Sequence, residues 1–330
     1  MLLAGDIGGT KTSLAIYSTR QGPHSPLVEE TYPSGKYPNL ESLVNNFLEK
    51  VDLPVEHASF GVAGPVVGSR ATITNLPWVL DEAQLSETLN LSSVRLINDL
   101  VAIAHAVPLL RSEDLFTLNE GEPVAGGTLA VIAPGTGLGK AYLTWHQSRY
   151  QPYASEGGHA DFAPKTLQEW ELRSFLQKKY DHVSYERVCS GKGIPNIYQF
   201  LKESGYAEEP EWLGDRLAEV DDPTPVIVNT ALSKEKDCKL CEETLRIFIS
   251  VLGAEAGNMA LRLMATGGVY LGGGIPPRII NTLKQPAFMQ SFTQKGRFSE
   301  FLSKIPVYVI KNPKVALVGA ACHGLEPSHE

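Results

Sequence analysis

Three glycine-rich segments carry the residue types that could bind a phosphate. They are Gly8, Gly9 and Thr10; Gly135, Thr136 and Gly137; and the pair Gly273 and Gly274. Glycine allows positive φ, and it lets backbone N–H groups approach a phosphate oxygen closely. The first two segments lack P-loop spacing, and a strand-like pattern follows each, so we expect β-hairpin turns whose amides and threonine hydroxyls hold phosphates. Either turn alone could be an ordinary hairpin, but together with the third segment, as an edge for adenosine, they favour a nucleotide site.

Asp6 ends the apolar run that precedes the first glycine turn. Aspartate is common where a turn begins, so a structural role is one interpretation. Mg²⁺ prefers one or two carboxylates together with phosphate oxygens, and the neighbouring turn is a candidate phosphate site. In this context the sequence favours Asp6 as the carboxylate that holds Mg²⁺, through water.

Five polar residues form a second set of candidates, suited to vicinal hydroxyl groups. They are Asn98, Asp99, Glu156, His159 and Glu186. Asn98 and Asp99 follow an apolar strand directly, where ligand sites of α/β proteins form, although Asp99 could also cap the next helix. A metal-binding helix at Glu156 and His159 is disfavoured by the two glycines between them. Glu186 is expected at a helix start, after Ser184 as cap.

The elements that must position these residues follow a repeated pattern. An apolar strand, a glycine turn and a second strand occur at Leu2–Tyr17 and again at Leu129–Trp145, about a domain's length apart. Strands and helices alternate around them. The predicted elements include strands at Ala58–Val62, Val94–Ile97 and Val269–Leu271, and helices at Leu40–Val51, Asp81–Leu89, Leu100–Ala106 and Leu245–Met264. This alternation predicts an α/β architecture with much of the sheet parallel.

Length and composition narrow the class of protein. A chain of 330 residues is expected to form two domains. The net charge is -8, and no Lys/Arg-rich run occurs, so nucleic acid is an improbable partner. The sequence predicts neither a signal peptide nor a membrane span. Four cysteines fit a reducing cytoplasm, and Cys238 and Cys241 lack the partners of a zinc site, so we expect no structural metal.

Nine motifs, in order from residue 4 to about residue 301, resemble the bacterial glucokinase family. They are GDIGGT, FGVAGPV, TNLPW, INDL, APGTGLG, EGGHADFAP, ERVCSGKG, YLGGGIPPR and KGRFSEFL. The resemblance implies an actin-like ATPase (ribonuclease H-like) fold with two α/β domains flanking a cleft. A small domain of residues 1–109 plus about 312–330 and a large domain of residues 110–311 with helical insertions are expected. The resemblance also implies a homodimer that uses ATP and Mg²⁺.

The activity implied by the resemblance is phosphorylation of D-glucose to glucose 6-phosphate. It implies glucose contacts from Asn98, Asp99, Glu156, His159 and Glu186, with Asp99 as general base. The family commonly has asparagine after GGT, where this chain has Lys11. Lys11 could contact a nucleotide phosphate or point to solvent. Kinases of mannose, fructose or an amino sugar stay open as alternatives, and so, less strongly, do a sugar sensor without catalysis and an actin-like assembly module.

Overall fold

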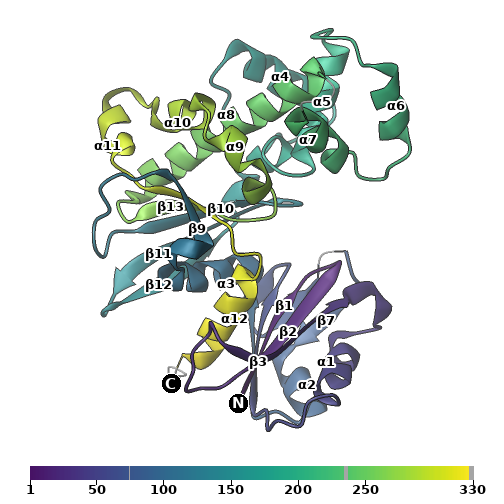
Figure 1. The fold of residues 1–330 in the computed structure, drawn as a ribbon, viewed down its shortest axis with the longest axis vertical. Coiled ribbons are helices and arrows are strands. Elements are labelled where there is room, and N and C mark those ends of the chain that lie inside the picture. Colours follow the sequence, from purple (N-terminus) through teal and green to yellow (C-terminus); the bar gives the residue numbers. More distant parts are fainter. Residues whose placement is uncertain (74, 234–236, 327–330) are drawn as a thin grey trace. The chain divides into compact units, whose positions relative to one another are not determined.

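The computed structural model describes residues 1–73, 75–233 and 237–326, and the chain forms two compact units. The first unit comprises Met1–Asp114, His146–Ala154 and Asn312–Glu330, of which residues 327–330 lie outside the described part. The second comprises Leu115–Trp145 and Ser155–Lys311. Each unit contains a mixed β-sheet with helices packed against it (Figure 1).

The sheet of the first unit has the strand order β3-β2-β1-β4-β8. The strands are β1 (Leu2–Ile7), β2 (Lys11–Tyr17), β3 (Pro26–Pro33), β4 (His57–Val62) and β8 (Ser93–Asn98). β1 and β2 form an antiparallel hairpin, while β4 lies parallel to both β1 and β8. The carboxyl ends of β1, β4 and β8 therefore meet at one sheet edge, which brings Asp6 and Asn98 to the same side of the unit.

One face of this sheet packs against α1 (Leu40–Leu48) and α2 (Glu82–Thr88), with the small sheet of β5 (Val66–Val67), β6 (Arg70–Thr72) and β7 (Val79–Asp81) beside them. The opposite face packs against α12 (Val315–Leu325), whose Leu317 lies among buried side chains of β1 and β2. Side chains are buried almost continuously along β1 and β2, and because successive side chains point to opposite faces, both faces of the sheet are apolar there.

The C-terminal helix α12 also packs closely along α3 (Asp99–Ala106), as Figure 1 shows. The two backbones approach at Gly319, where an added Cβ would lie 1.6 Å from the carbonyl oxygen of Ala102. A side chain at this position would force the helices apart, so the small residues of α12 allow α3 to lie near the carboxyl ends of the strands.

The second sheet repeats the topology of the first, with the order β12-β11-β10-β13-β14-β9. Its strands are β9 (Leu115–Asn119), β10 (Leu129–Pro134), β11 (Leu138–His146), β12 (Arg149–Ser155), β13 (Gly268–Leu271) and β14 (Val307–Ile310). β10 forms an antiparallel hairpin with β11 and lies parallel to β13, which lies parallel to β14. The repeat predicted from the two glycine turns is confirmed, with β9 as an additional antiparallel strand.

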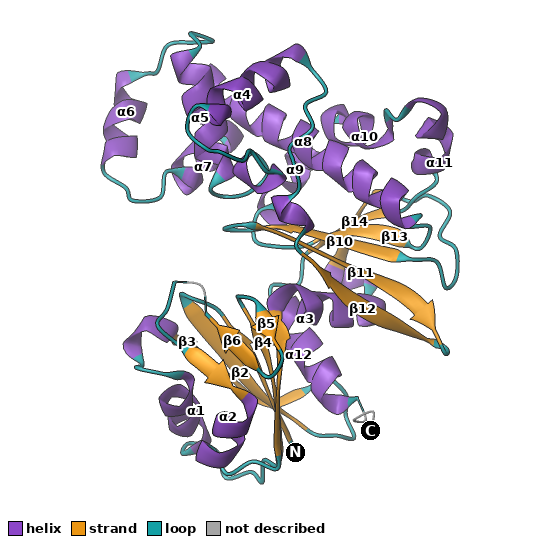
Figure 2. Ribbon diagram, turned by 180° about the vertical axis from the view of Figure 1, so that it is seen from behind, coloured by secondary structure: helices purple, strands orange, loops and turns teal. Residues whose placement is uncertain are grey.

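Helices form a layer on this second sheet, seen in Figure 2. They are α4 (Leu167–Gln177), α5 (Gly193–Glu203), α6 (Glu211–Ala218), α7 (Thr224–Leu232), α8 (Lys239–Leu263), α9 (Ile280–Leu283), α10 (Pro286–Thr293) and α11 (Ser299–Ser303). The central α8 begins at Lys239, earlier than the predicted start at Leu245, and it is buried along most of its length. Burial on several sides explains its mixed apolar pattern.

Cys238 is the N-cap residue of α8, and Cys241 lies in its first turn. Both side chains are buried and reduced, and burial together with the neighbouring Cys238 raises the pKa of the Cys241 thiol. Across residues 1–73, 75–233 and 237–326, no helix combines the length and the apolar character that crossing a membrane requires.

Candidate active site

The first glycine turn joins β1 to β2 and is fixed from outside the hairpin. The Gly8 amide donates to the Lys11 carbonyl at 3.0 Å, and the Ser34 hydroxyl donates to the Gly8 carbonyl at 2.7 Å. The Ser34 amide donates to the Thr10 carbonyl at 3.0 Å. Within the described residues, the amides of Gly9 and Thr10 have no acceptor. The turn therefore offers N–H donors without a protein acceptor among the described residues, which suit an anionic oxygen.

Asp6 lies at the end of β1, opposite Ser13 in the ladder with β2. Burial, together with the negative charge of nearby Asp99, raises the pKa of its carboxyl to about 7. A divalent cation would relieve the repulsion between these two carboxylates. Asp6 therefore fits the carboxylate predicted to hold Mg²⁺.

Asn98 and Asp99 lie where β8 ends and α3 begins. The N-cap residue of α3 is Asn98, and the prediction that Asp99 caps the helix is corrected. Asn98 is the N-cap residue, and its side-chain oxygen accepts from the Leu100 amide at 3.0 Å. Asp99 is the first helical residue, although its Oδ1 also lies 2.9 Å from the same amide. Asparagine has cap propensity as strong as aspartate, and it precedes Asp99 in the chain. The Asn98 amide group also donates to the Gly64 carbonyl at 3.0 Å, which fixes its orientation.

The second glycine turn, between β10 and β11, is closed by a hydrogen bond from the Gly135 amide to the Gly137 carbonyl at 2.9 Å. The Gly191 amide donates to the Gly135 carbonyl at 2.7 Å, so the segment before α5 supports the turn. Neither the Thr136 nor the Gly137 amide finds an acceptor in the described parts of the chain. Both hairpins predicted from sequence are therefore present and offer similar donors.

The third glycine segment lies beside this second hairpin, in the same unit. The Gly272 amide donates to the Ile132 carbonyl at 2.9 Å, and the Ile275 amide lies 3.3 Å from the Pro134 carbonyl oxygen. Gly273 and Gly274 therefore connect β13 to the 3₁₀ turn Pro276–Ile279 next to the end of β10. This places the predicted adenosine edge adjacent to the predicted phosphate turn.

Glu186 is tied to the second hairpin by its carboxylate, whose Oε2 accepts from the Leu138 amide at 2.9 Å. It lies in a 3₁₀ turn, Tyr185–Arg187, preceded by Ser184 at the N-cap position. The prediction of a helix start is right in position. Ser184, however, makes no side-chain hydrogen bond to that turn, so its predicted capping role is wrong.

Glu156 directly precedes a single 3₁₀ turn, Gly157–His159, of which His159 is the last residue. Their side chains are well exposed, and His159 Nε2 lies 3.9 Å from Glu156 Oε2. The turn rests on β11, because an added Cβ at Gly158 would lie 2.0 Å from the Leu138 carbonyl oxygen. Glycine is needed at this position, and the contact brings the turn to the strand whose first residue binds Glu186.

His159 and Glu186 line one pocket of about 380 Å³. The other lining residues are Lys179, Tyr180, Asp181, His182, Ser184 and Arg187. His182 is hydrogen-bonded to Asp161, and the Arg187 guanidinium lies 4.0 Å from the Tyr180 ring centroid. No local sequence pattern distinguishes His182 as a site residue, whereas Arg187 lies within the ERVCSGKG motif. A larger pocket of about 860 Å³ is lined by none of the predicted site residues.

Among the described residues, no group of three or more His, Cys, Asp or Glu side chains is arranged to hold a metal ion. The candidate residues are divided between the two units. Asp6, Gly8, Gly9, Thr10, Lys11, Asn98 and Asp99 belong to the first; Gly135, Thr136, Gly137, Glu156, His159, Glu186, Gly273 and Gly274 belong to the second.

The repeated sheets and the glycine hairpins define a sugar kinase of the actin-like ATPase fold. A solved glucokinase from an Antarctic psychrotroph has a TM-score of 0.82 to this chain, at 30% identity over 98% of both chains. The glucokinase from Balamuthia mandrillaris, solved in complex with glucose, also has a TM-score of 0.82, at 20% identity over 98% of this chain and 93% of its own. The latter likeness shows the shared fold.

Sequence comparison defines the family. The glucokinase family model matches residues 3–326. The glucokinase of Nostoc punctiforme is 42% identical over 97% of this chain and 98% of its own length, and that of Salmonella arizonae is 36% identical over 97% and 96%. This chain belongs to the glucokinase family, whose members phosphorylate glucose with ATP.

Proposed function

We propose that this protein transfers the γ-phosphoryl group of ATP to the 6-hydroxyl of D-glucose, with Asp99 as general base. The supporting observation is the position of Asp99 as the first residue of α3, beside the carboxyl end of β8 and near Asp6. A carboxylate at this position can accept the hydroxyl proton as the new bond to phosphorus develops.

The glucose hydroxyls are bound by Asn98, Asp99, Glu156, His159 and Glu186. Asn98 is fixed by Gly64 and Leu100, and Glu186 is fixed by Leu138, so both are oriented before the sugar arrives. Glu156 and His159 are exposed and available for hydrogen bonds. Preorganised polar groups lose less entropy on binding, which favours a sugar of matching geometry.

The nucleotide is held by two hairpins and one further glycine segment. The residues are Gly8, Gly9, Thr10 and Lys11; Gly135, Thr136 and Gly137; and Gly273 and Gly274. The amides of both turns would donate to phosphate oxygens, and Asp6 would hold Mg²⁺ through water. When bound, Mg²⁺ would neutralise charge on the transferring phosphoryl group. The donor set fits this role, since a buried carboxylate and free amides complement a cation and an anion.

We propose a small domain of residues 1–109 plus about 312–330 and a large domain of residues 110–311, as the family resemblance implies. The two compact units differ from these bounds in grouping residues 110–114 and His146–Ala154 with the first unit. We extend the proposal to a cytoplasmic homodimer. Size-exclusion chromatography with light scattering measures the oligomeric state, and a mass of one chain would contradict the dimer.

ADP release tests the proposed reaction, measured with a coupled assay and with glucose, mannose, fructose and glucosamine as separate acceptors. We expect the largest kcat/KM for glucose. Asp99→Asn keeps the shape but removes the base, so kcat should fall by about 10²–10⁴-fold while glucose still binds. Isothermal titration of glucose measures binding separately from turnover.

Asp52→Asn is the matched control, because Asp52 is an exposed aspartate of the same unit. We expect this control to keep the wild-type kcat. Turnover of the Asp99→Asn variant close to that of the wild type would overturn the assignment of the base. Preference for another hexose would revise the substrate.

A further inference from the structure

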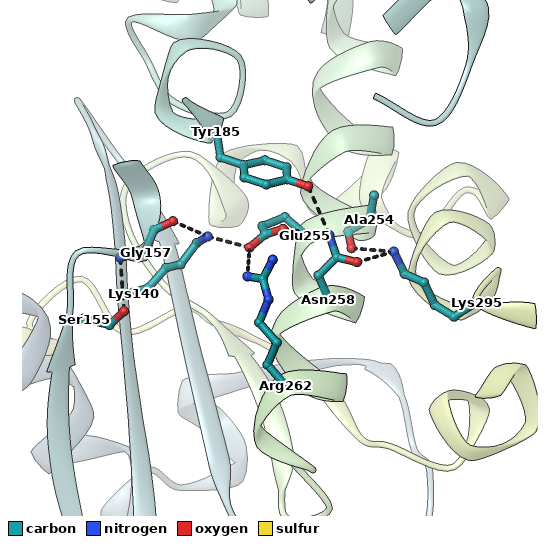
Figure 3. Close-up of polar contacts among 9 residues, drawn as sticks. All are labelled: Lys140, Ser155, Gly157, Tyr185, Ala254, Glu255, Asn258, Arg262 and Lys295. Atoms are coloured by element: carbon teal, nitrogen blue, oxygen red, sulfur yellow. Dashed lines mark hydrogen bonds and ion pairs between the residues drawn. The ribbon is translucent and has the colours of Figure 1, made fainter. Parts of the chain in front are cut away.

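A buried ion pair links β11 to the central helix α8, outside the set of proposed substrate ligands. Lys140 on β11 is 3% exposed and Glu255 on α8 is fully buried, and Lys140 Nζ lies 2.6 Å from Glu255 Oε1 (Figure 3). Desolvating two charges costs several kcal/mol, and their attraction often only offsets that cost. The pair is therefore weak evidence for stability, and the contacts around it indicate what else it does.

Lys140 also contacts the turn that holds two proposed glucose ligands, on the side opposite Glu255 (Figure 3). Its Nζ donates a second hydrogen bond, at 2.7 Å, to the carbonyl oxygen of Gly157. Gly157 lies directly between Glu156 and the Gly158 contact with β11, and His159 ends the same turn. The lysine head group is therefore a direct anchor for the backbone between Glu156 and His159, as the dashed lines of Figure 3 show.

The same cluster extends to the segment that carries Glu186. The Asn258 amide group donates to Glu255 Oε2 at 2.8 Å and to the Tyr185 hydroxyl at 3.0 Å. The Tyr185 ring is buried, and Lys140 Nζ lies 5.0 Å from its centroid. Tyr185 directly precedes Glu186 in the chain, so a second loop with a proposed glucose ligand rests on the same cluster.

Lys295 closes the cluster on the side of α10 and α11. Its Nζ donates to Asn258 Oδ1 at 2.6 Å and to the Ala254 carbonyl at 3.1 Å. Because Asn258 then has its oxygen occupied by Lys295, its amide group must face Glu255 and Tyr185. The partners of Asn258 therefore determine its orientation, so that its amide group joins α8 to the Tyr185 hydroxyl.

We infer that Lys140 and Glu255 are positioning residues for glucose binding, with Lys140 holding the Glu156–His159 turn and Glu255 holding Lys140. This inference rests on the proposed function, because it concerns the proposed ligands of glucose. We expect the pair to affect glucose binding and not ATP binding, because it is connected to Gly157 directly and to Tyr185 through Asn258. The glycine turn at Gly135–Gly137 is held by other bonds, from Gly191 and within the turn.

The chain offers a matched pair of variants, because Glu255 has two cationic partners. Arg262 Nη1 lies 3.1 Å from Glu255 Oε1, and the Arg262 side chain is 58% exposed. Lys140→Met leaves Glu255 paired with Arg262 and removes the bond to Gly157. Arg262→Met leaves Glu255 paired with Lys140 and keeps that bond. Each variant therefore removes one cation from the same carboxylate, and only the first loosens the turn.

Steady-state kinetics on the full-length protein separates these effects. For Lys140→Met we expect the KM for glucose to rise about tenfold or more, since a hydrogen bond from a charged donor is lost. The KM for ATP should stay within about twofold of wild type, and Arg262→Met should leave both constants within about twofold. An unchanged KM for glucose in a folded Lys140→Met variant would overturn the inference.

The double variant Lys140→Met/Glu255→Gln tests whether the pair is merely structural, and it replaces the single variant if that one fails to fold. It removes the buried charge of Glu255, which in Lys140→Met keeps only the exposed Arg262 as a cationic partner, so its melting temperature should exceed that of Lys140→Met. We expect the KM for glucose to remain raised, because the bond to Gly157 is still absent. Recovery of both quantities would overturn the positioning role. A wild-type protein without glucose-dependent ADP release would instead refute the proposed function itself.

Discussion

The two glycine hairpins of this protein share a topology but differ in where they obtain charge. In the first hairpin the acid lies on the strand itself, as Asp6 at the end of β1. In the second hairpin, β10 is apolar and fully buried. The carboxylate beside this hairpin belongs to Glu186, which accepts a hydrogen bond from the Leu138 amide and lies 48 residues further along the chain. The same hairpin therefore occurs twice, with a carboxylate on its own strand in the first unit and a carboxylate from a distant segment in the second.

The lysines on the second strand of each hairpin differ in the same way. Lys11 opens β2 with an exposed side chain, whereas Lys140 on β11 is buried and paired with Glu255. Exposure leaves a lysine free for a ligand, while burial commits it to the protein. The comparison indicates that strand position alone does not determine function; the surrounding polar groups do.

Removing the charge of Asp6 should produce the largest effect among the tests of how the two hairpins differ. For Asp6→Asn we expect Mg²⁺-dependent turnover to fall by about 10²-fold or more, because the proposed metal ligand is lost. The coupled ADP assay over a range of Mg²⁺ concentrations measures it. The control Asp81→Asn alters a carboxylate that caps α2 in the same unit, and it should keep turnover close to wild type.

Asp6→Asn should also stabilise the protein in Mg²⁺-free buffer. The folded pKa of Asp6, about 7, exceeds the ordinary 3.8, so ionisation costs the folded state free energy as pH rises between these values. At pH 8 we expect the variant to be more stable than wild type by about 1 kcal/mol or more, with no difference below pH 4. Urea unfolding measures this, and a less stable variant at pH 8 would indicate a structural carboxylate.

Local patterns predicted the frame of this site well. Glycine turns between apolar runs identified both hairpins, and the strand before Asn98 identified the carboxyl end of β8, because these signals depend on neighbouring residues. The prediction that Asp99 caps α3 was wrong, because Asn98 and Asp99 are adjacent and have similar N-cap propensities. The pairing of Lys140 with Glu255 joins residues 115 positions apart, and nothing local in the sequence signals it.

Acid sensitivity should distinguish the first unit from the second. His323 on α12 is hydrogen-bonded to the Ser59 hydroxyl at 3.0 Å. Burial, together with the nearby charges of His105 and Arg95, lowers the pKa of His323 to about 4. The folded state therefore binds this proton less well than the unfolded chain, and the stability present above pH 6.5 is lost as pH falls toward 4.

His323→Asn should weaken this acid dependence while leaving a polar group near Ser59. We expect the loss of unfolding free energy between pH 7 and pH 4.5 to shrink by about 1–3 kcal/mol in urea titrations. His57→Asn is the control, since His57 is an exposed histidine of the same unit. Equal pH dependence in wild type and His323→Asn would assign the acid sensitivity to other groups.

The smallest expected effect concerns Lys11, and it tests the contrast with Lys140 directly. Its side chain is exposed beside the first glycine turn, where a proposed phosphate contact would be solvated and therefore weak. For Lys11→Met we expect the KM for ATP to rise about three- to tenfold, with the melting temperature and the KM for glucose unchanged. Lys140→Met should show the opposite kinetic pattern. A Lys11→Met variant with wild-type KM for ATP would establish that Lys11 points to solvent, which leaves the amides of Gly9 and Thr10 as the phosphate donors of that hairpin.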